Sequence, residues 1–250
     1  MELQNQVIIV TGGASGIGKE AALALAAKGA NLIVADFNEA GAQAVAAQAT
    51  GFGVKAKAFK VDVSDAAQVE AMVEFAVTTF GTLNGIFNNA GISATKPFLE
   101  MDPASYHKVI GVDQHSVYYG MYYAARKMVE LGATGTFVNT ASIFGTMASA
   151  GSFNYNAAKA AVVMMSKSAA LELANHGIRV VGVAPGFIDT PMFGEGHDDL
   201  KAAVAKLHIH NRLIQPAKVA SVVAFLFTEA AQAINGTTVP VDDGFLVFKA

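Results

Sequence analysis

Two side chains that can exchange a proton lie four residues apart, Tyr155 and Lys159, in a segment that should begin a helix. This spacing places both side chains on one helix face. A phenol with its ordinary pKa of about 10 is a poor base near neutral pH. A neighbouring ammonium group stabilises the phenolate and lowers that pKa, so Tyr155 is a candidate general acid and base. The same spacing also arises by chance on many helices, so the pair alone identifies no activity.

Ser142 is a third candidate catalytic residue. It follows the apolar segment 136–138 and precedes Tyr155 by 13 positions. Open α/β sheets bind ligands at the carboxyl ends of their strands, so Ser142 is placed to donate a hydrogen bond to a substrate oxygen. A serine that only caps the following loop is the alternative.

A glycine-rich segment connects the apolar run 7–10 to a predicted helix at 16–29. Glycines let the backbone turn sharply beside a pyrophosphate, and the helix N-terminus offers free N–H groups to the phosphates. A glycine-rich turn without a ligand is the alternative, weakened by the strand before it and the helix after it. The segment therefore predicts a dinucleotide site formed by Gly12, Ser15, Gly16, Ile17 and Gly18.

The end of the second predicted strand indicates which dinucleotide binds. Asp36 lies near the offset of about 20 residues at which an acidic side chain binds the adenosine ribose. Its carboxylate would repel a 2′-phosphate, and the next residues, Phe37 and Asn38, carry no positive charge. NAD is therefore expected rather than NADP, with Asp36 and Phe37 in the adenosine site. The alternative is an Asp that only favours the start of the next helix.

Short apolar segments alternate with longer Ala-rich segments along the whole chain. This alternation predicts an α/β fold, a Rossmann-type doubly wound seven-stranded parallel sheet with helices on both faces. We expect one domain over residues 1–250, with 191–213 as an excursion that forms a substrate lid. The expected strands are 7–10, 31–35, 56–61, 85–87, 136–138, 179–183 and 237–241, and the main helices are 16–29, 66–80, 104–131, 154–175 and 216–228.

Composition excludes several classes of protein. Hydrophobic residues make up 53% and charged residues 15%, which suits a large core and excludes a disordered chain. A net charge of −3 with 17 scattered basic residues argues against a nucleic-acid partner. No apolar run is long enough for a membrane helix, and the polar start lacks a signal peptide. With no cysteine, we expect a cytoplasmic protein without a thiolate metal site, and this chemistry needs no metal.

Taken together, these residues resemble the short-chain dehydrogenase/reductase family along the whole chain. The family's glycine motif matches residues 11–18, its Asn-Asn-Ala-Gly motif matches 88–91, and its Ser, Tyr and Lys match Ser142, Tyr155 and Lys159. The resemblance implies that the cofactor also contacts Asp62, Val63, Asn89, Ala90, Gly91, Tyr155, Lys159, Pro185, Gly186, Ile188 and Thr190.

The resemblance also implies catalytic roles. Tyr155 exchanges a proton with the substrate oxygen, Ser142 orients that oxygen, and Lys159 binds the nicotinamide ribose and lowers the pKa of Tyr155. Hydride passes between the substrate carbon and the nicotinamide ring, which is chemistry of the cofactor.

One position departs from the family pattern. The family usually has Asn after a Val on the long helix, whereas Val112 is followed here by Asp113. Asp113 is thus a candidate catalytic residue that brings a carboxylate near Tyr155 and Lys159. At about 7 Å from the pair it would raise the pKa that governs alcohol oxidation. The alternatives are an Asp113 protonated by burial, or one paired with another cation.

Aromatic side chains indicate the substrate. Phe144 and Phe187 are expected at the nicotinamide end together with Phe153, Met192 and Phe193. They favour a small apolar secondary alcohol or ketone, such as a cyclic alcohol or a diketone. The alternatives are a 3-oxoacyl-carrier-protein reductase, a sugar or polyol dehydrogenase, and a non-enzymatic NAD-binding regulator. Asp36 and Ser15 weaken the first, and retention of Ser, Tyr and Lys weakens the last.

The long helices also predict an assembly. Members of the family commonly pair these helices between subunits, which implies a homotetramer. The outward-facing residues are expected to be Tyr118, Tyr122, Val163 and Met164.

Overall fold

Seven parallel strands form one sheet at the centre of the molecule, in a computed structural model that describes residues 2–193 and 198–247. The spatial order is β3-β2-β1-β4-β5-β6-β7, and every neighbouring pair is parallel. This confirms the predicted doubly wound sheet. The strands are β1 (Val7–Thr11), β2 (Asn31–Asp36), β3 (Ala56–Lys60), β4 (Gly85–Asn88), β5 (Gly135–Thr140), β6 (Ile178–Pro185) and β7 (Thr238–Val241).

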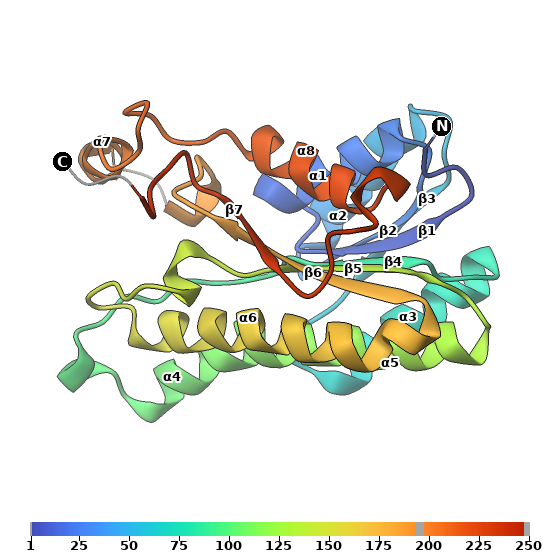
Figure 1. Cartoon of the computed structure of the whole chain (residues 1–250), viewed down its shortest axis with the longest axis horizontal. Coiled ribbons are helices and arrows are strands. Elements are labelled where there is room, and N and C mark those ends of the chain that lie inside the picture. Colours follow the sequence, from blue (N-terminus) through green and yellow to red (C-terminus); the bar gives the residue numbers. More distant parts are fainter. Residues whose placement is uncertain (1, 194–197, 248–250) are drawn as a thin grey trace.

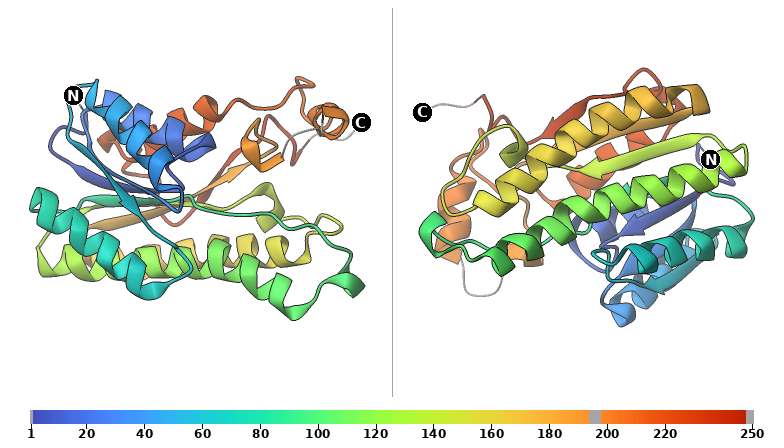
Figure 2. Two further views of the ribbon diagram at one scale, coloured as in Figure 1. Left: turned by 180° about the vertical axis from the view of Figure 1, so that it is seen from behind. Right: turned by 90° about the horizontal axis from the view of Figure 1, so that it is seen from below.

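Helices cover both faces of the sheet (Figures 1 and 2). One face carries α1 (Gly16–Ala27), α2 (Glu39–Thr50) and α8 (Pro216–Leu226), and the other carries α3 (Ala66–Phe80), α5 (Ser116–Glu130) and α6 (Phe153–Leu173). The hydrophobic core is correspondingly divided in two. Neighbouring residues of β1 point into different halves, Val10 toward α1 and Ile9 toward α3, because side chains alternate along a strand. Strands buried on both faces explain the continuous apolar runs in the sequence.

The predicted boundaries of α3 are confirmed, and local signals account for both ends. At the N-terminus, the Asp65 carboxylate accepts hydrogen bonds from the N–H groups of Ala67 and Gln68. At the C-terminus, Gly81 adopts a left-handed conformation with φ of 81°, which stops the helix.

The helix predicted over 104–131 is divided by a π-helical turn. The structure has α4 (Pro103–Ile110), the π-helical turn η2 (Gly111–His115) and then α5. A π-helical turn places one additional residue in the helix and changes the face that following side chains present. The hydroxyl of Ser116 donates to the carbonyl of Val112 in this turn. Asp113 lies inside the turn and is fully buried.

The segment expected as a lid leaves the sheet after β6 and returns at Ile214, whose main chain pairs with Ile188. It contains the short helix η5 (Pro191–Phe193) and a helix that the sequence did not predict, α7 (Asp198–Ala205). Residues 194–197 of the expected lid lie outside the described residues. Figure 1 shows α7 at the same end of the molecule as the start of α6. No helix in the described part of the chain is both long and apolar enough to cross a membrane.

Candidate active site

The glycine-rich turn between β1 and α1 has no room for a side chain at Gly12 or Gly18. A Cβ on Gly18 would lie 2.1 Å from the carbonyl oxygen of Gly12, and a Cβ on Gly12 would lie 2.9 Å from the Cα of Ala90. Gly12 also has φ of 63°, where a side chain is disfavoured. The backbone can therefore approach a bound group closely at this turn.

The N-terminus of α1 has the properties of an anion site. Ser15 is the N-cap, but its side chain makes no capping hydrogen bond, and the first turn contains no acidic residue. The N–H groups of Gly16, Ile17 and Gly18 therefore keep their affinity for a negative group. Thr190 closes the other side, since a Cβ on Gly16 would lie 3.3 Å from its Cγ2 atom.

Asp36, at the predicted adenosine side of the site, is held by the main chain. Its Oδ2 atom accepts a hydrogen bond from the N–H of Ala14 at 2.9 Å, and its Oδ1 atom accepts one from the N–H of Asn38 at 2.8 Å. The carboxylate remains partly exposed beside the glycine turn. Phe37 follows with 71% of its surface exposed. An acidic acceptor and an open aromatic face suit the ribose and adenine of a dinucleotide.

The carboxyl end of β4 is tied to the glycine turn. The Thr11 hydroxyl accepts hydrogen bonds from the N–H groups of Asn89 at 3.0 Å and Ala90 at 3.2 Å. The Asn89 amide donates to the carbonyl of Thr11 at 3.1 Å. These bonds hold Asn89, Ala90 and Gly91 beside the predicted cofactor site.

The remaining expected cofactor residues lie beside the carboxyl ends of the strands. Asp62 and Val63 follow β3, where the Asp62 carboxylate accepts hydrogen bonds from the main chain and hydroxyl of Ser64. Pro185 ends β6, and the N–H of Gly186 donates to the carbonyl of Val241. Ile188 is buried at its bridge to Ile214.

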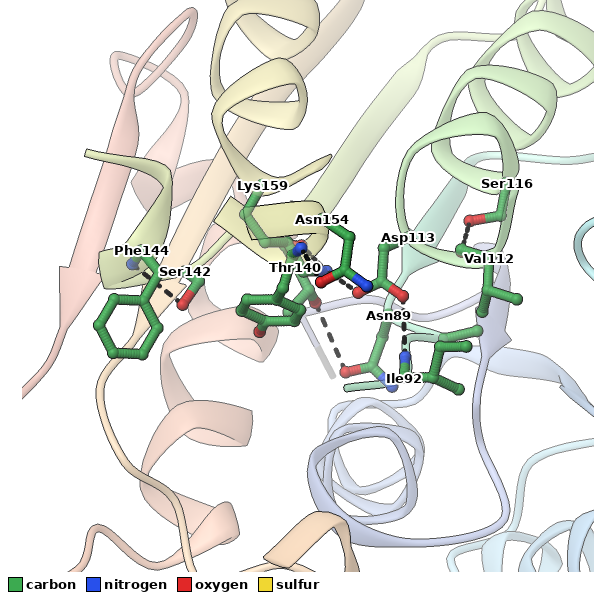
Figure 3. A network of polar contacts seen from close by, with 12 residues as sticks. Asn89, Ile92, Val112, Asp113, Ser116, Thr140, Ser142, Phe144, Asn154 and Lys159 are labelled. Atoms are coloured by element: carbon green, nitrogen blue, oxygen red, sulfur yellow. Dashed lines mark hydrogen bonds and ion pairs between the residues drawn. The ribbon is translucent and has the colours of Figure 1, made fainter. Parts of the chain in front are cut away.

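Ser142, Tyr155 and Lys159 converge from β5 and α6. Ser142 lies just beyond β5, where its Oγ atom accepts the N–H of Phe144 at 3.2 Å (Figure 3). Ser142 is also close enough to the Tyr155 phenol to act against the rise of its pKa. The Lys159 ammonium group donates to the carbonyl of Thr140 at 3.0 Å and lies 5.5 Å from the centre of the Tyr155 ring.

Asp113 contacts Lys159 directly, which corrects the expected separation of about 7 Å. Its Oδ2 atom lies 3.1 Å from the Lys159 Nζ atom, and both side chains are almost completely buried. The other carboxylate oxygen accepts the N–H of Ile92 at 2.8 Å (Figure 3). The π-helical turn is what directs Asp113 inward, and the sequence pattern alone did not reveal it.

These contacts shift three pKa values. Burial raises the pKa of the Tyr155 phenol, Asp113 raises it further, and Lys159 with Ser142 opposes the rise without cancelling it. The expected lowering by Lys159 is thus present but outweighed. Burial by itself would lower the pKa of Lys159, but the negative charge of Asp113 raises it overall. Burial raises the pKa of Asp113, and Lys159 limits that rise.

Aromatic rings form a wall beside Ser142. The ring centre of Phe187 lies 5.8 Å from that of Phe144, 6.2 Å from that of Phe193 and 5.5 Å from that of Phe245. His208 is fully buried against this group. We call Phe144, Phe187, Phe193, Phe245 and His208 the aromatic wall.

Sequence reasoning placed some of these residues wrongly or missed them. Phe153 has its aromatic contacts with Phe98 and Tyr106 rather than with the wall. Phe245 was missed because it follows the last strand without any motif. His208 carries no motif either, and it is buried, with its Nε2 atom accepting the N–H of Phe187 at 3.3 Å. Within the described residues, no three His, Asp or Glu side chains are grouped as metal ligands.

Comparison with known proteins identifies the family. A family model described as enoyl-(acyl carrier protein) reductase, which belongs to the short-chain dehydrogenase/reductase family, matches residues 12–246. The chain is a short-chain dehydrogenase/reductase. This confirms the resemblance found in the sequence.

Curated members of the family are similar over nearly the whole chain. A cyclohexanol dehydrogenase of Acinetobacter sp. (strain SE19) is 40% identical over 245 residues, covering 98% of this chain and 96% of that protein. A levodione reductase of Leifsonia aquatica is 36% identical over 251 residues, covering 96% of this chain and 94% of that protein.

Solved structures agree with the fold. A short-chain dehydrogenase/reductase from Mycobacterium marinum has a TM-score of 0.95 at 31% identity, covering 99% of this chain and 98% of that one. A levodione reductase has a TM-score of 0.93 at 33% identity, covering 99% and 100%. The protein is thus an oxidoreductase of the family that acts on alcohol or ketone groups with a nicotinamide cofactor, as the sequence predicted.

Proposed function

We propose that this protein interconverts small cyclic secondary alcohols and ketones using NAD(H). The observation that carries the proposal is the convergence of Ser142, Tyr155 and Lys159 beside the aromatic wall, at the carboxyl ends of the strands. In an open α/β sheet this edge is where a substrate and a dinucleotide meet.

The preference for NAD rests on Asp36. Its carboxylate lies at the end of β2 and is held by the N–H groups of Ala14 and Asn38. A 2′-phosphate beside this charge would be repelled, whereas two ribose hydroxyl groups can donate to it. Neither Phe37 nor Asn38 offers a cation to compensate.

The cofactor would be held by three groups of residues. The glycine turn and the α1 N-terminus, with Gly12, Ser15, Gly16, Ile17 and Gly18, would hold the pyrophosphate. Asp36, Phe37, Asp62 and Val63 would hold the adenosine half, and the nicotinamide half would contact Asn89, Ala90, Gly91, Tyr155, Lys159, Pro185, Gly186, Ile188 and Thr190. When bound, the nicotinamide ring supplies or accepts the hydride.

The side chains of the site manage the proton and the substrate oxygen. Ser142 donates a hydrogen bond to that oxygen and polarises it. The Tyr155 phenol gives its proton to the oxygen in reduction and takes it back in oxidation. Lys159 stabilises the phenolate form and would bind the ribose of the nicotinamide.

The substrate class follows from the aromatic wall. Phe144 and Phe187 stand next to Ser142, so a flat or puckered apolar ring would bury its surface against them. Relatives named for cyclohexanol and for cis-4-hydroxycyclohexanecarboxylate support a six-membered ring as the substrate scaffold. The described residues of the predicted lid, 191–193 and 198–213, would cover this ring.

The proposal is tested with purified protein and a panel of ketones and secondary alcohols, each assayed with NAD(H) and NADP(H). Cyclic six-membered substrates should give the highest kcat/KM, and NAD(H) should be preferred. Fastest turnover on an open-chain acyl thioester or on a sugar would refute the substrate class.

We further propose a cytoplasmic homotetramer, built on α5 and α6. Tyr118, Tyr122 and Met164 expose 51%, 40% and 59% of their surfaces, and together they line an apolar groove between these helices. Val163, expected on the same face, instead packs inward against the core. A chain without cysteine suits the reducing cytoplasm.

A further inference from the structure

The strongest unexplained feature of the molecule is a buried ion pair behind the proposed proton donor. Asp113 and Lys159 expose 0% and 3% of their side chains, and their charged atoms lie 3.1 Å apart. Taking two charges out of water is costly unless further polar contacts compensate them. An ion pair of this kind calls for a functional explanation.

Each charge has one additional partner, and all these partners are backbone groups. The Asp113 Oδ1 atom accepts the N–H of Ile92 at 2.8 Å. The Lys159 Nζ atom donates to the carbonyl of Thr140 at 3.0 Å. The pair is thereby anchored to the segment after β4 and to the end of β5, two rigid parts of the sheet edge.

The fold leaves room for this carboxylate. A Cβ on Gly91 would lie 3.0 Å from the Asp113 Oδ2 atom and 3.5 Å from the Lys159 Nζ atom. A side chain at position 91 would therefore press on both members of the pair. The carboxylate must also point into the protein, and the π-helical turn provides this orientation. Asp113 in the turn is buried, whereas the next residue, Gln114, lines the groove on the outer surface.

We propose that Asp113 is a positioning residue of the active site, whose carboxylate fixes the Lys159 ammonium group beside the Tyr155 ring and balances its charge. It takes the place of the Asn that the family pattern usually has here. This inference rests on the proposed function of Tyr155 as the proton donor and acceptor.

The charge balance has a definite sign for the chemistry. Alcohol oxidation needs Tyr155 as phenolate, and ketone reduction needs it as phenol. A carboxylate disfavours the nearby phenolate, and Asp113 does raise the pKa of Tyr155. Asp113 therefore keeps the Tyr155 phenol protonated up to a higher pH. This favours ketone reduction near neutral pH and moves the pH range of fast alcohol oxidation upward.

Few other titratable groups lie near enough to shift the pKa of Tyr155 as Asp113 does. The π-helical turn packs against α4, α5 and α6. On these elements and on the turn itself, His107, Lys108 and His115 are exposed, and Tyr118 and Tyr119 lie on the next turn of α5. Among the described residues, the charges that act on Tyr155 are those of Lys159 and Asp113.

The test is Asp113→Asn, which keeps the shape and removes the charge. We expect an active enzyme whose rising limb for oxidation and falling limb for reduction both move to lower pH, by about one pH unit. A residue that only supported the fold would lower kcat without moving both limbs together. Asp113→Ala should additionally lose the positioning of Lys159, with a fall in kcat of about ten-fold or more that Asn largely rescues.

A matched control removes a charge elsewhere. Glu229→Gln takes one negative charge from an exposed residue of η6 (Glu229–Ala231), at the opposite, amino-terminal edge of the sheet. The pH profiles of Glu229→Gln should match those of the wild type.

The outcomes distinguish the two proposals. If Tyr155→Phe keeps activity, the proposed function fails. If Tyr155→Phe is inactive while the Asp113→Asn profile does not move, or moves to higher pH, only the role of Asp113 fails.

A second measurement needs no variant at Asp113. The ultraviolet phenolate band of Tyr155 is obtained as the difference between titrations of the wild type and of Tyr155→Phe, without cofactor. With Asp113 charged beside Lys159, this band should appear only above pH of about 10, the ordinary phenol value. A band that appears near neutral pH would overturn the proposal.

Discussion

The Lys159 ammonium group lies over the ring of Tyr155, 5.5 Å from its centre, while it also donates to the carbonyl of Thr140. The two side chains come from successive turns of α6, so the helix sets their separation. The Thr140 carbonyl belongs to β5, so this contact fixes α6 against the sheet edge where Ser142 lies. Lys159 thus links Tyr155, the proposed proton donor, to the end of β5.

Tyr155→Phe should reduce kcat by about 10²–10⁴-fold or more, because removal of general acid–base catalysis has costs of that size. Binding of NADH, measured by its fluorescence, should be almost unchanged. Tyr119→Phe makes the same change on α5 and serves as the control, with wild-type kcat expected. A Tyr155→Phe enzyme that keeps a third of the wild-type kcat would disprove the role of the phenol.

Asp36→Asn should shift cofactor choice toward NADP(H). The amide keeps one oxygen for the ribose and removes the charge that repels a 2′-phosphate. The ratio of kcat/KM for NADH to that for NADPH should fall by about ten-fold or more, which corresponds to roughly 1.4 kcal/mol. Glu39→Gln, at the first residue of α2, is the matched loss of charge and should leave the ratio as it is. If Asp36→Asn and Glu39→Gln gave the same ratio of kcat/KM for NADH to that for NADPH, Asp36 would not select the cofactor.

Lys159→Met should destabilise the protein by about 3–5 kcal/mol, because it leaves the buried Asp113 carboxylate without its cation. Adding Asp113→Asn should recover part of that loss, since no uncompensated charge then remains. Urea unfolding of the wild type, both single variants and the double variant gives the coupling energy. Lys167→Met, an exposed change on the same helix, is the control. Additive effects of the two changes would show that the charges do not stabilise each other.

Phe245→Ala should raise the KM for cyclohexanone by about ten-fold, because the wall loses a ring that packs against Phe144 and Phe187. Leu246→Ala is the neighbouring control, and its partly exposed side chain should matter little. Steady-state kinetics with cyclohexanone and with a small open-chain ketone distinguishes a loss of ring binding from a general defect. Equal changes of KM in Phe245→Ala and Leu246→Ala would show that Phe245 does not contact the substrate.

Light scattering at micromolar concentration should give the mass of a tetramer. Tyr122→Glu with Met164→Glu should lower that mass, because both charges would be buried in the proposed interface on α5 and α6. Phe52→Glu changes an exposed aromatic residue beyond α2 and should leave the mass unchanged. A wild-type monomer would contradict the proposed assembly.

The sequence alone determined the order of elements, the family and the residues of the chemical motifs. The glycine turn before α1, the cap and stop of α3, and the spacing of Tyr155 and Lys159 are local, because each is set within one element or one turn. Such features follow from backbone geometry and side-chain periodicity, which a single stretch of sequence contains.

The tertiary structure decided which distant residues meet. Asp113 reaches Lys159 because a π-helical turn redirects it, and one helix packs against another there. Phe245 joins Phe187 after the chain has passed through α7, α8 and β7. Contacts of this kind depend on the packing of whole elements, and burial then changes their chemistry, as it does for the pKa of Tyr155. No local sequence pattern records that packing. The position of the Asp113 carboxylate behind Tyr155 and the place of Phe245 in the aromatic wall could therefore be seen only in the folded molecule.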